Sequence, residues 1–174
     1  MKRFAILVCA LTIAGCGSKS PTEPTNPNVV TFKANLSAAN EVPPITNAES
    51  GANGTATITV NLTRDGAGNI TGGTTSWTFN LAGFPANSTI ILNHIHEAAP
   101  GVNGGVVINS GLTPGTAISL PNGTLATQTF SNLTPQNNDF GVYQRMITNP
   151  NGFYFNVHTP LNGGGAVRGP LVKQ

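Results

Sequence analysis

Residues 54–62 read Gly-Thr-Ala-Thr-Ile-Thr-Val-Asn-Leu, and this stretch decides the fold class. The apolar side chains of Ala56, Ile58, Val60 and Leu62 alternate with polar ones, the period-two pattern of a strand with one buried and one solvated face. Threonine and asparagine supply the polarity, and threonine favours strands while asparagine favours turns. The stretch therefore predicts a strand of an all-β protein.

Similar short runs continue along the chain and are separated by turn signals. Asn-Gly pairs, which supply the positive-φ residues of tight turns, begin at Asn53, Asn103, Asn122, Asn151 and Asn162. The predicted strands cover 29–36, 54–62, 74–81, 88–96, 105–109, 123–131, 152–158 and 165–172. One short helix is predicted over 137–147. No helical stretch is long enough to connect parallel strands, so we expect an antiparallel β-sandwich or barrel, with a Greek-key or superoxide-dismutase-like topology.

The N-terminus has the pattern of an export signal. Lys2 and Arg3 precede an uncharged, mostly apolar run over 4–15, which is too short for a permanent membrane span. The segment Ile13-Ala14-Gly15-Cys16 resembles the bacterial lipobox, and this resemblance implies cleavage before Cys16 and acylation of its thiol. An ordinary signal peptide is the alternative. We thus expect a signal peptide over 1–15, an acylated cysteine with a Pro-rich tether over 16–28, and one domain over 29–174.

Charge and cysteine content narrow the class of function. The 174 residues carry a formal net charge of +2, and removal of Lys2 and Arg3 leaves six basic and six acidic residues. The remaining bases are scattered, which argues against a nucleic-acid partner. Cys9 leaves with the leader and Cys16 is assigned to lipid, so no thiol remains for a disulfide or a metal. The expected partner is a lipid bilayer, with the domain outside the cytoplasm of a bacterial cell envelope, at the outer membrane if the cell has one.

Three histidines are the most chemically distinctive residues. His94 and His96 end a predicted strand and point to one face of it, with alpha carbons about 6.6 Å apart. His158 ends another predicted strand, on the face that also carries Tyr154 and Asn156. If the two strands are neighbours, three imidazoles converge, and neutral imidazoles suit copper or zinc better than calcium or magnesium. The alternative is a hydrogen-bond network that joins the histidines to Arg168.

Four separated motifs resemble the CHRD domain, a domain named for chordin and common in secreted bacterial proteins. They occur in the expected order over about residues 30 to 172, as Ala38-Ala39-Asn40-Glu41-Val42-Pro43-Pro44, His94-Ile95-His96-Glu97 with Gly101-Val102-Asn103-Gly104-Gly105-Val106-Val107, Phe155-Asn156-Val157-His158-Thr159-Pro160, and Val167-Arg168-Gly169-Pro170-Leu171. The resemblance implies an extracellular β-sandwich. A weaker likeness to copper/zinc superoxide dismutases, in the paired and later single histidine and the glycine-rich turn before an arginine, implies copper at His94, His96 and His158. The further histidines of those enzymes are lacking here, which argues against dismutation.

Other polar residues are secondary candidates. Arg168, Asn156 and Glu97 are candidates to bind an anion or to hydrogen-bond the histidine ligands. Glu97 is expected to point to the other strand face from His96. Glu41 is expected to pair with a base or to cap a turn rather than to act in catalysis. The leading hypothesis is a lipid-anchored module that binds copper or zinc. A non-metal adhesion or scaffolding domain with structural histidines is the alternative, and a copper-dependent redox enzyme has the least support because no acid or base is evident beside the histidines.

Overall fold

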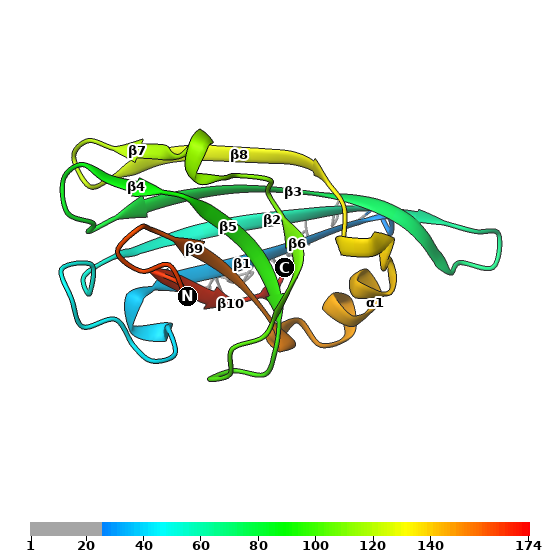
Figure 1. The fold of residues 1–174 in the computed structure, drawn as a ribbon. Coiled ribbons are helices and arrows are strands. Elements are labelled where there is room, and N and C mark those ends of the chain that lie inside the picture. The colour runs from blue at the N-terminus through cyan, green and yellow to red at the C-terminus, as the bar shows by residue number, and fades with distance from the viewer. Residues whose placement is uncertain (1–25) are drawn as a thin grey trace, which may run out of the picture.

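The computed structural model describes residues 26–174, which form an antiparallel, almost wholly β structure with one short α-helix (Figure 1). The predicted all-β class is confirmed. The elements are β1 (Val29–Ser37), η1 (Ala38–Asn40), β2 (Asn53–Arg64), β3 (Ile70–Ala82), β4 (Ser88–Ile90), β5 (Leu92–Glu97), β6 (Gly105–Asn109), η2 (Pro114–Thr116), β7 (Ile118–Leu120), β8 (Leu125–Leu133), η3 (Gln136–Asn138), α1 (Gly141–Thr148), η4 (Pro150–Gly152), β9 (Phe153–His158), β10 (Val167–Pro170) and β11 (Val172–Lys173). Within residues 26–174, no helix has the length and apolar character that a membrane crossing requires.

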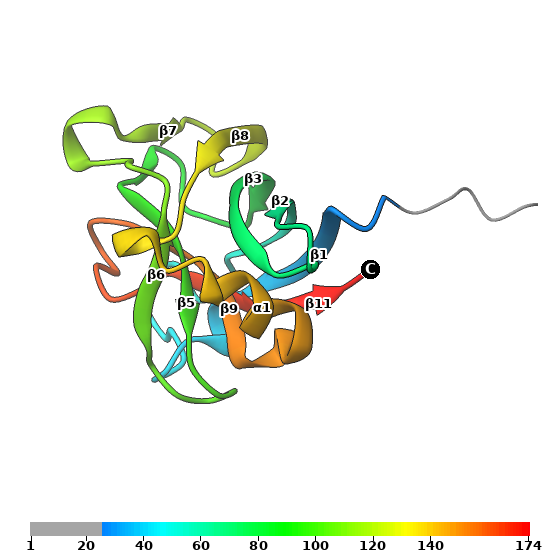
Figure 2. The same cartoon turned by 90° about the vertical axis from the view of Figure 1, so that its right-hand side faces the viewer.

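One large sheet forms most of the molecule and curls over on itself. Its strand order is β6-β5-β9-β10-β1-β2-β3-β8, with β11 also paired to β1, while β4 and β7 form a separate two-stranded sheet. Figure 2 shows the curl: β5 and β9 lie on one side and β2 and β3 on the other. An isolated bridge joins Ile108 of β6 to Pro135, just after β8, so the two edges of the sheet approach each other. The sandwich is therefore made by one sheet that turns back on itself.

The core lies between the two limbs of the curled sheet. Alternation buries Ile58 on β2 and brings Trp77 and Phe79 of β3 inward. Both rings contact Phe155 of β9, with ring centroids 5.4 and 5.5 Å apart respectively. Trp77 Nε1 also donates a hydrogen bond of 2.8 Å to Asn93 Oδ1 on β5, which satisfies the indole nitrogen in a dry environment. These contacts hold β5 and β9 in place from the core side.

Two predicted strands are divided in the structure. The expected strand 88–96 breaks at Ile91, because β4 pairs with β7 whereas β5 joins the large sheet. The three-residue β7 was not predicted, since it is too short to show alternation. The expected strand 165–172 is divided at Leu171, whose backbone N–H donates to Phe153 O of β9, while β11 beyond it pairs with β1. The predicted helix begins later than expected because Asn137 and Asn138 adopt positive φ.

The strand β9 is buried along its whole length, and this burial positions the site. Phe153, Phe155 and Val157 face the core, while the intervening side chains face the opposite side of the sheet. That opposite side is covered by three irregular segments, 38–50, 98–104 and 159–165, which hydrogen-bond to side chains on β5, β9 and β10. The outer face of β9 thus becomes a second, polar interior.

Candidate metal centre

The strands β5 and β9 are direct neighbours, as the convergence of the three histidines requires. Their register pairs His94 with Asn156, His96 with Tyr154 and Leu92 with His158. Residues directly opposite in a sheet share a face, so His94, His96 and His158 all project into the polar interior. The three side chains are 6%, 9% and 5% exposed, respectively.

The imidazole nitrogens are close enough together to hold one ion. One nitrogen from each of His94, His96 and His158 lies within 4.8 Å of the others, and His94 Nδ1 is 3.2 Å from His158 Nε2. Nitrogens bound at about 2 Å to a common ion lie at most about 4 Å apart. A pair at the 4.8 Å limit would therefore have to close by about 0.8 Å or more on binding.

Two loop carbonyls set the tautomers of two histidines. Nδ1 of His96 lies 2.9 Å from Gly104 O, and Nδ1 of His158 lies 3.0 Å from Gly163 O. A carbonyl oxygen only accepts, so both Nδ1 atoms carry the proton and both Nε2 atoms keep a lone pair. Nε2 of His96 is buried and has no hydrogen-bond partner among the described residues. This is the kind of backbone support that orients histidine ligands in metal sites.

The cluster favours neutral imidazoles. Burial, together with the nearby His158 and His96, lowers the pKa of His94 to about 4. Burial is also the largest cause of the lowered pKa values of His96 and His158. A metal competes with protons for the same lone pairs, so lowered pKa values leave the nitrogens available to a cation at neutral pH.

A stack of three side chains flanks the cluster. The ring of Tyr154 lies parallel to that of His96 with centroids 4.8 Å apart, and the guanidinium of Arg168 lies 4.7 Å from the Tyr154 centroid. Tyr154 Oη also accepts a hydrogen bond of 3.1 Å from the N–H of Gly104. Gly104 therefore binds His96 through its carbonyl and Tyr154 through its amide, and it fixes the position of both rings.

Asn156 and Arg168 are paired across β9 and β10, and both contact Glu41. Asn156 Nδ2 donates to Glu41 Oε1 at 2.8 Å, and Arg168 Nε lies 3.7 Å from Glu41 Oε2. Burial raises the pKa of Glu41 to about 7, an effect that the charge of Arg168 and the Asn156 hydrogen bond reduce but do not cancel. Glu41 pairs with a base, as expected, and Arg168 and Asn156 lie beside the cluster without a hydrogen bond to a histidine.

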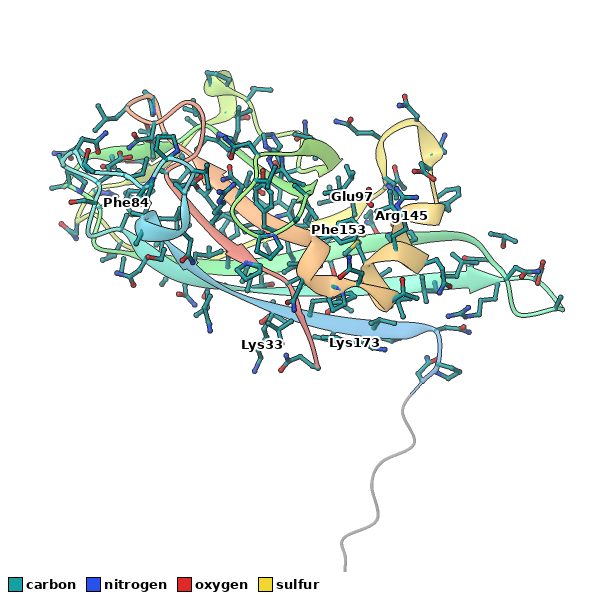
Figure 3. The ribbon with its side chains drawn as sticks, turned by 90° about the horizontal axis from the view of Figure 1, so that it is seen from below. Lys33, Phe84, Glu97, Arg145, Phe153 and Lys173 are labelled. Atoms are coloured by element: carbon teal, nitrogen blue, oxygen red, sulfur yellow. The ribbon has the colours of Figure 1, made fainter. Side chains whose placement is uncertain are left out.

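Glu97 is engaged elsewhere. Its two carboxylate oxygens accept hydrogen bonds of 2.8 and 3.0 Å from Arg145 of α1, and Figure 3 shows the two side chains directed toward each other. Arg145 also binds Asp139, and these carboxylates raise its pKa. Glu97 was suggested to support the histidines, but its carboxylate contacts Arg145 and not a histidine. Successive strand residues point to opposite faces, so Glu97 lies on the other face from His96.

Sequence reasoning missed the residues that hold the histidines from outside. Tyr154 shares its strand face with Asn156 and His158, so its alternation was visible, but its stacking on His96 depends on the register of β5 against β9. Gly104 and Gly163 act through backbone carbonyls, which leave no side-chain signal. The only sequence signal for these loops is the close spacing of glycines within 101–105 and 163–165, which is typical of tightly folded loops.

A curled antiparallel sheet with a buried histidine triad defines an all-β domain that could hold a metal ion. The family model described as the CHRD domain matches residues 32–171, which is most of the chain. The chain therefore belongs to the CHRD domain family, as its motifs indicated. Searches of curated proteins and of solved structures returned no significant match.

Proposed function

We propose that this CHRD domain is a membrane-anchored, extracytoplasmic binding module that holds a copper or zinc ion through His94, His96 and His158. The observation that carries the proposal is the buried Nε2 of His96, which has no partner among the described residues and lies in a cluster of three imidazoles whose ligand nitrogens are all within 4.8 Å. A buried acceptor without a partner costs about 1 to 3 kcal/mol, and a metal bond would remove that penalty.

The donor set supports copper or zinc over other common ions. Three nitrogen ligands from neutral imidazoles match the preferences of both metals. Among residues 26–174, no carboxylate joins the cluster of ligand atoms, as calcium or magnesium would prefer. With Nδ1 of each ring held by the Gly104 or Gly163 carbonyl, Nε2 of His96 and Nε2 of His158 are the ligating atoms. Nε2 of His158 accepts from His94 Nδ1, and a bound ion would replace that hydrogen bond. Divalent copper usually binds such sites more tightly than zinc, so we expect copper to displace zinc.

Metal titration of the metal-free, full-length chain tests this function. We expect one ion per chain, and at least about 100-fold weaker binding when His94→Ala and His96→Ala are combined, because two of three ligands are then lost. Isothermal titration calorimetry with Zn²⁺ and Cu²⁺ gives the stoichiometry and affinity. Nitrogen hyperfine structure in the electron paramagnetic resonance spectrum of the Cu²⁺ form identifies the imidazoles.

A matched control separates ligation from general electrostatics. Glu97→Gln removes the carboxylate adjacent in sequence to His96, yet Glu97 binds Arg145 and not the cluster. This variant should bind metal within about twofold of the parent, since exposed ion pairs contribute little. Absence of stoichiometric metal in the parent, or equal affinity in the double histidine variant, would refute the metal function.

Anchoring rests on Cys16, which lies outside the described residues. The lipobox-like segment 13–16 and the three prolines within 17–28 support a lipid anchor followed by a spacer. We expect Cys16→Ser to move the protein from the membrane fraction to the soluble extracytoplasmic fraction and to abolish incorporation of labelled palmitate. A Ser18→Ala control should stay in the membrane fraction. Membrane retention of the Cys16 variant at the parent level would refute the anchor.

One observation favours a second candidate, a non-metal adhesion or scaffolding domain. The hydrogen bond of 3.2 Å between His94 Nδ1 and His158 Nε2 already satisfies part of the cluster without an ion. With Nδ1 of His158 donating to Gly163, His94 is the donor in this pair. In such a domain the double histidine variant would lose stability while metal titrations of parent and variant stayed alike.

A further inference from the structure

Glu49 is a buried carboxylate on the irregular segment 38–50, and it has no basic partner. The residue is 3% exposed, and none of the ion pairs among residues 26–174 includes it. Burial of a carboxylate is unfavourable unless hydrogen bonds replace the lost water. The hydrogen bonds of Glu49 therefore indicate what its burial stabilises.

The carboxylate of Glu49 holds one turn, residues 159–162. Its Oε2 accepts hydrogen bonds from Thr159 Oγ1 at 2.7 Å and from Asn162 Nδ2 at 2.6 Å. The turn is also closed internally, because Asn162 N donates to Thr159 Oγ1 at 3.0 Å. Asn47 supports the same contact through side-chain hydrogen bonds of 2.9 and 3.3 Å with Asn162. Hydrogen bonds to an ionised carboxylate are the strong ones of this set, so Glu49 is the main tie on the turn.

This turn connects a candidate metal ligand to the carbonyl that orients it. Thr159 directly follows His158 in the chain. Asn162 directly precedes Gly163, whose carbonyl lies 3.0 Å from His158 Nδ1. A Cβ added at Gly163 would meet no atom within 4 Å, so packing does not hold this glycine in place. Its position depends on Asn162, because on the other side Gly165 N donates back to Asn162 O at 3.1 Å.

We propose that Glu49 is a positioning residue for the metal centre. Its carboxylate fixes Asn162, and Asn162 places the Gly163 carbonyl that keeps the proton of His158 on Nδ1. The lone pair of His158 Nε2 is then available to the ion. Glu49 itself does not belong to the cluster of ligand atoms, so it acts only through these contacts. This inference rests on the proposed metal function and names a residue that controls the affinity of that site.

Titration of the metal-free, full-length chain with Zn²⁺ tests the proposal through two substitutions at one position. Glu49→Ala removes the acceptor and should weaken Zn²⁺ binding about 10-fold. Glu49→Gln removes the charge but keeps an acceptor oxygen, so its affinity should stay within about threefold of the parent. Parent-like affinity of Glu49→Ala would overturn the proposal. Equal losses in both variants would also overturn it, because the charge of Glu49 would then act on the ion directly. Absence of Zn²⁺ binding by the parent would instead refute the metal function itself.

The tautomer of His158 in the metal-free protein separates positioning from a general loss of stability. Long-range proton–nitrogen correlation spectra in nuclear magnetic resonance distinguish a protonated Nδ1 from a protonated Nε2. We expect a protonated Nδ1 in the parent and in Glu49→Gln, and a mixture of the two tautomers in Glu49→Ala. Val60→Ala destabilises the core without touching these hydrogen bonds and should keep the tautomer of the parent. A parent-like tautomer in Glu49→Ala would contradict the positioning role.

Thr159→Val breaks the same link from the other side and keeps the test independent of how well Glu49→Ala folds. Valine has nearly the shape of threonine but lacks the hydroxyl that donates to Glu49 Oε2 and accepts from Asn162 N. We expect Thr159→Val to weaken Zn²⁺ binding at least about threefold. Combined with Glu49→Ala it should add little to the loss, because both residues act in one chain of contacts. Parent-like affinity of Thr159→Val, or full additivity of the two losses, would contradict the assignment.

Discussion

Gly104→Ala is expected to destabilise the domain by about 3 kcal/mol and to weaken metal binding about 10- to 100-fold. A Cβ at this position would overlap Glu97 O and would lie 2.6 Å from Ala98 Cβ. The first of these contacts is with backbone, so the loop must move. Movement of Gly104 breaks both its hydrogen bond to His96 and its hydrogen bond to Tyr154.

The neighbouring glycine provides a control for this prediction. A Cβ at Gly105 meets no atom within 4 Å, and the residue is exposed. Gly105→Ala should therefore fold with parent-like stability and bind metal with parent-like affinity. Urea unfolding followed by fluorescence of Trp77 measures the free energy, and calorimetric titration measures the metal. If Gly104→Ala matched Gly105→Ala in both measurements, the loop would not be what orients His96.

The unfolding free energy of Glu41→Gln, compared with that of the parent, is expected to increase by about 3 kcal/mol as pH rises from about 4 to about 8. The folded state raises the pKa of Glu41 from 4.5 to about 7, so over that interval the folded protein holds a proton that the unfolded chain has released. The parent therefore loses stability as pH rises from 4.5 through 7. The glutamine cannot ionise and lacks this loss.

The histidines act in the opposite direction and serve as an internal reference. Burial lowers the pKa of His94 from 6.5 to about 4, so its contribution to stability is present above pH 6.5 and is lost as pH falls toward 4. This acid-side loss should appear equally in the parent and in Glu41→Gln. Unfolding curves of both metal-free proteins across this pH range measure the difference. A difference that does not change with pH would contradict the raised pKa of Glu41.

The fold class was readable from the sequence because strand alternation is a local property. Ile58 on β2 and Phe155 on β9 lie inward as their alternation predicted. The division of the expected strand 88–96 was not readable, because it depends on the pairing of β4 with the very short β7. Partner choice of this kind arises from contacts between residues about 30 positions apart, which no local pattern encodes.

In the candidate site too, features that depend on strand alternation were predictable, and features that depend on loops distant in sequence were not. The shared face of His94 and His96, and the position of His158 on its strand, followed from alternation and were confirmed in the register of β5 against β9. Burial of the cluster was not predictable, because the cover comes from loops whose backbone atoms carry the contacts. Glu97 is adjacent to His96 in sequence, which suggested a supporting role toward the histidines. In the structure its carboxylate binds Arg145 instead.

The register of β5 and β9 has a consequence for the unfolded chain. His94 and His158 are 64 positions apart, and residues 26–174 contain no cysteine that could form a disulfide. An ion bound by both would be a cross-link across this long interval. In the chain-entropy picture, a permanent closure of that length removes about 4 kcal/mol of freedom from the unfolded ensemble. Unlike a disulfide, such a cross-link would be released by a chelator without any reduction of a covalent bond.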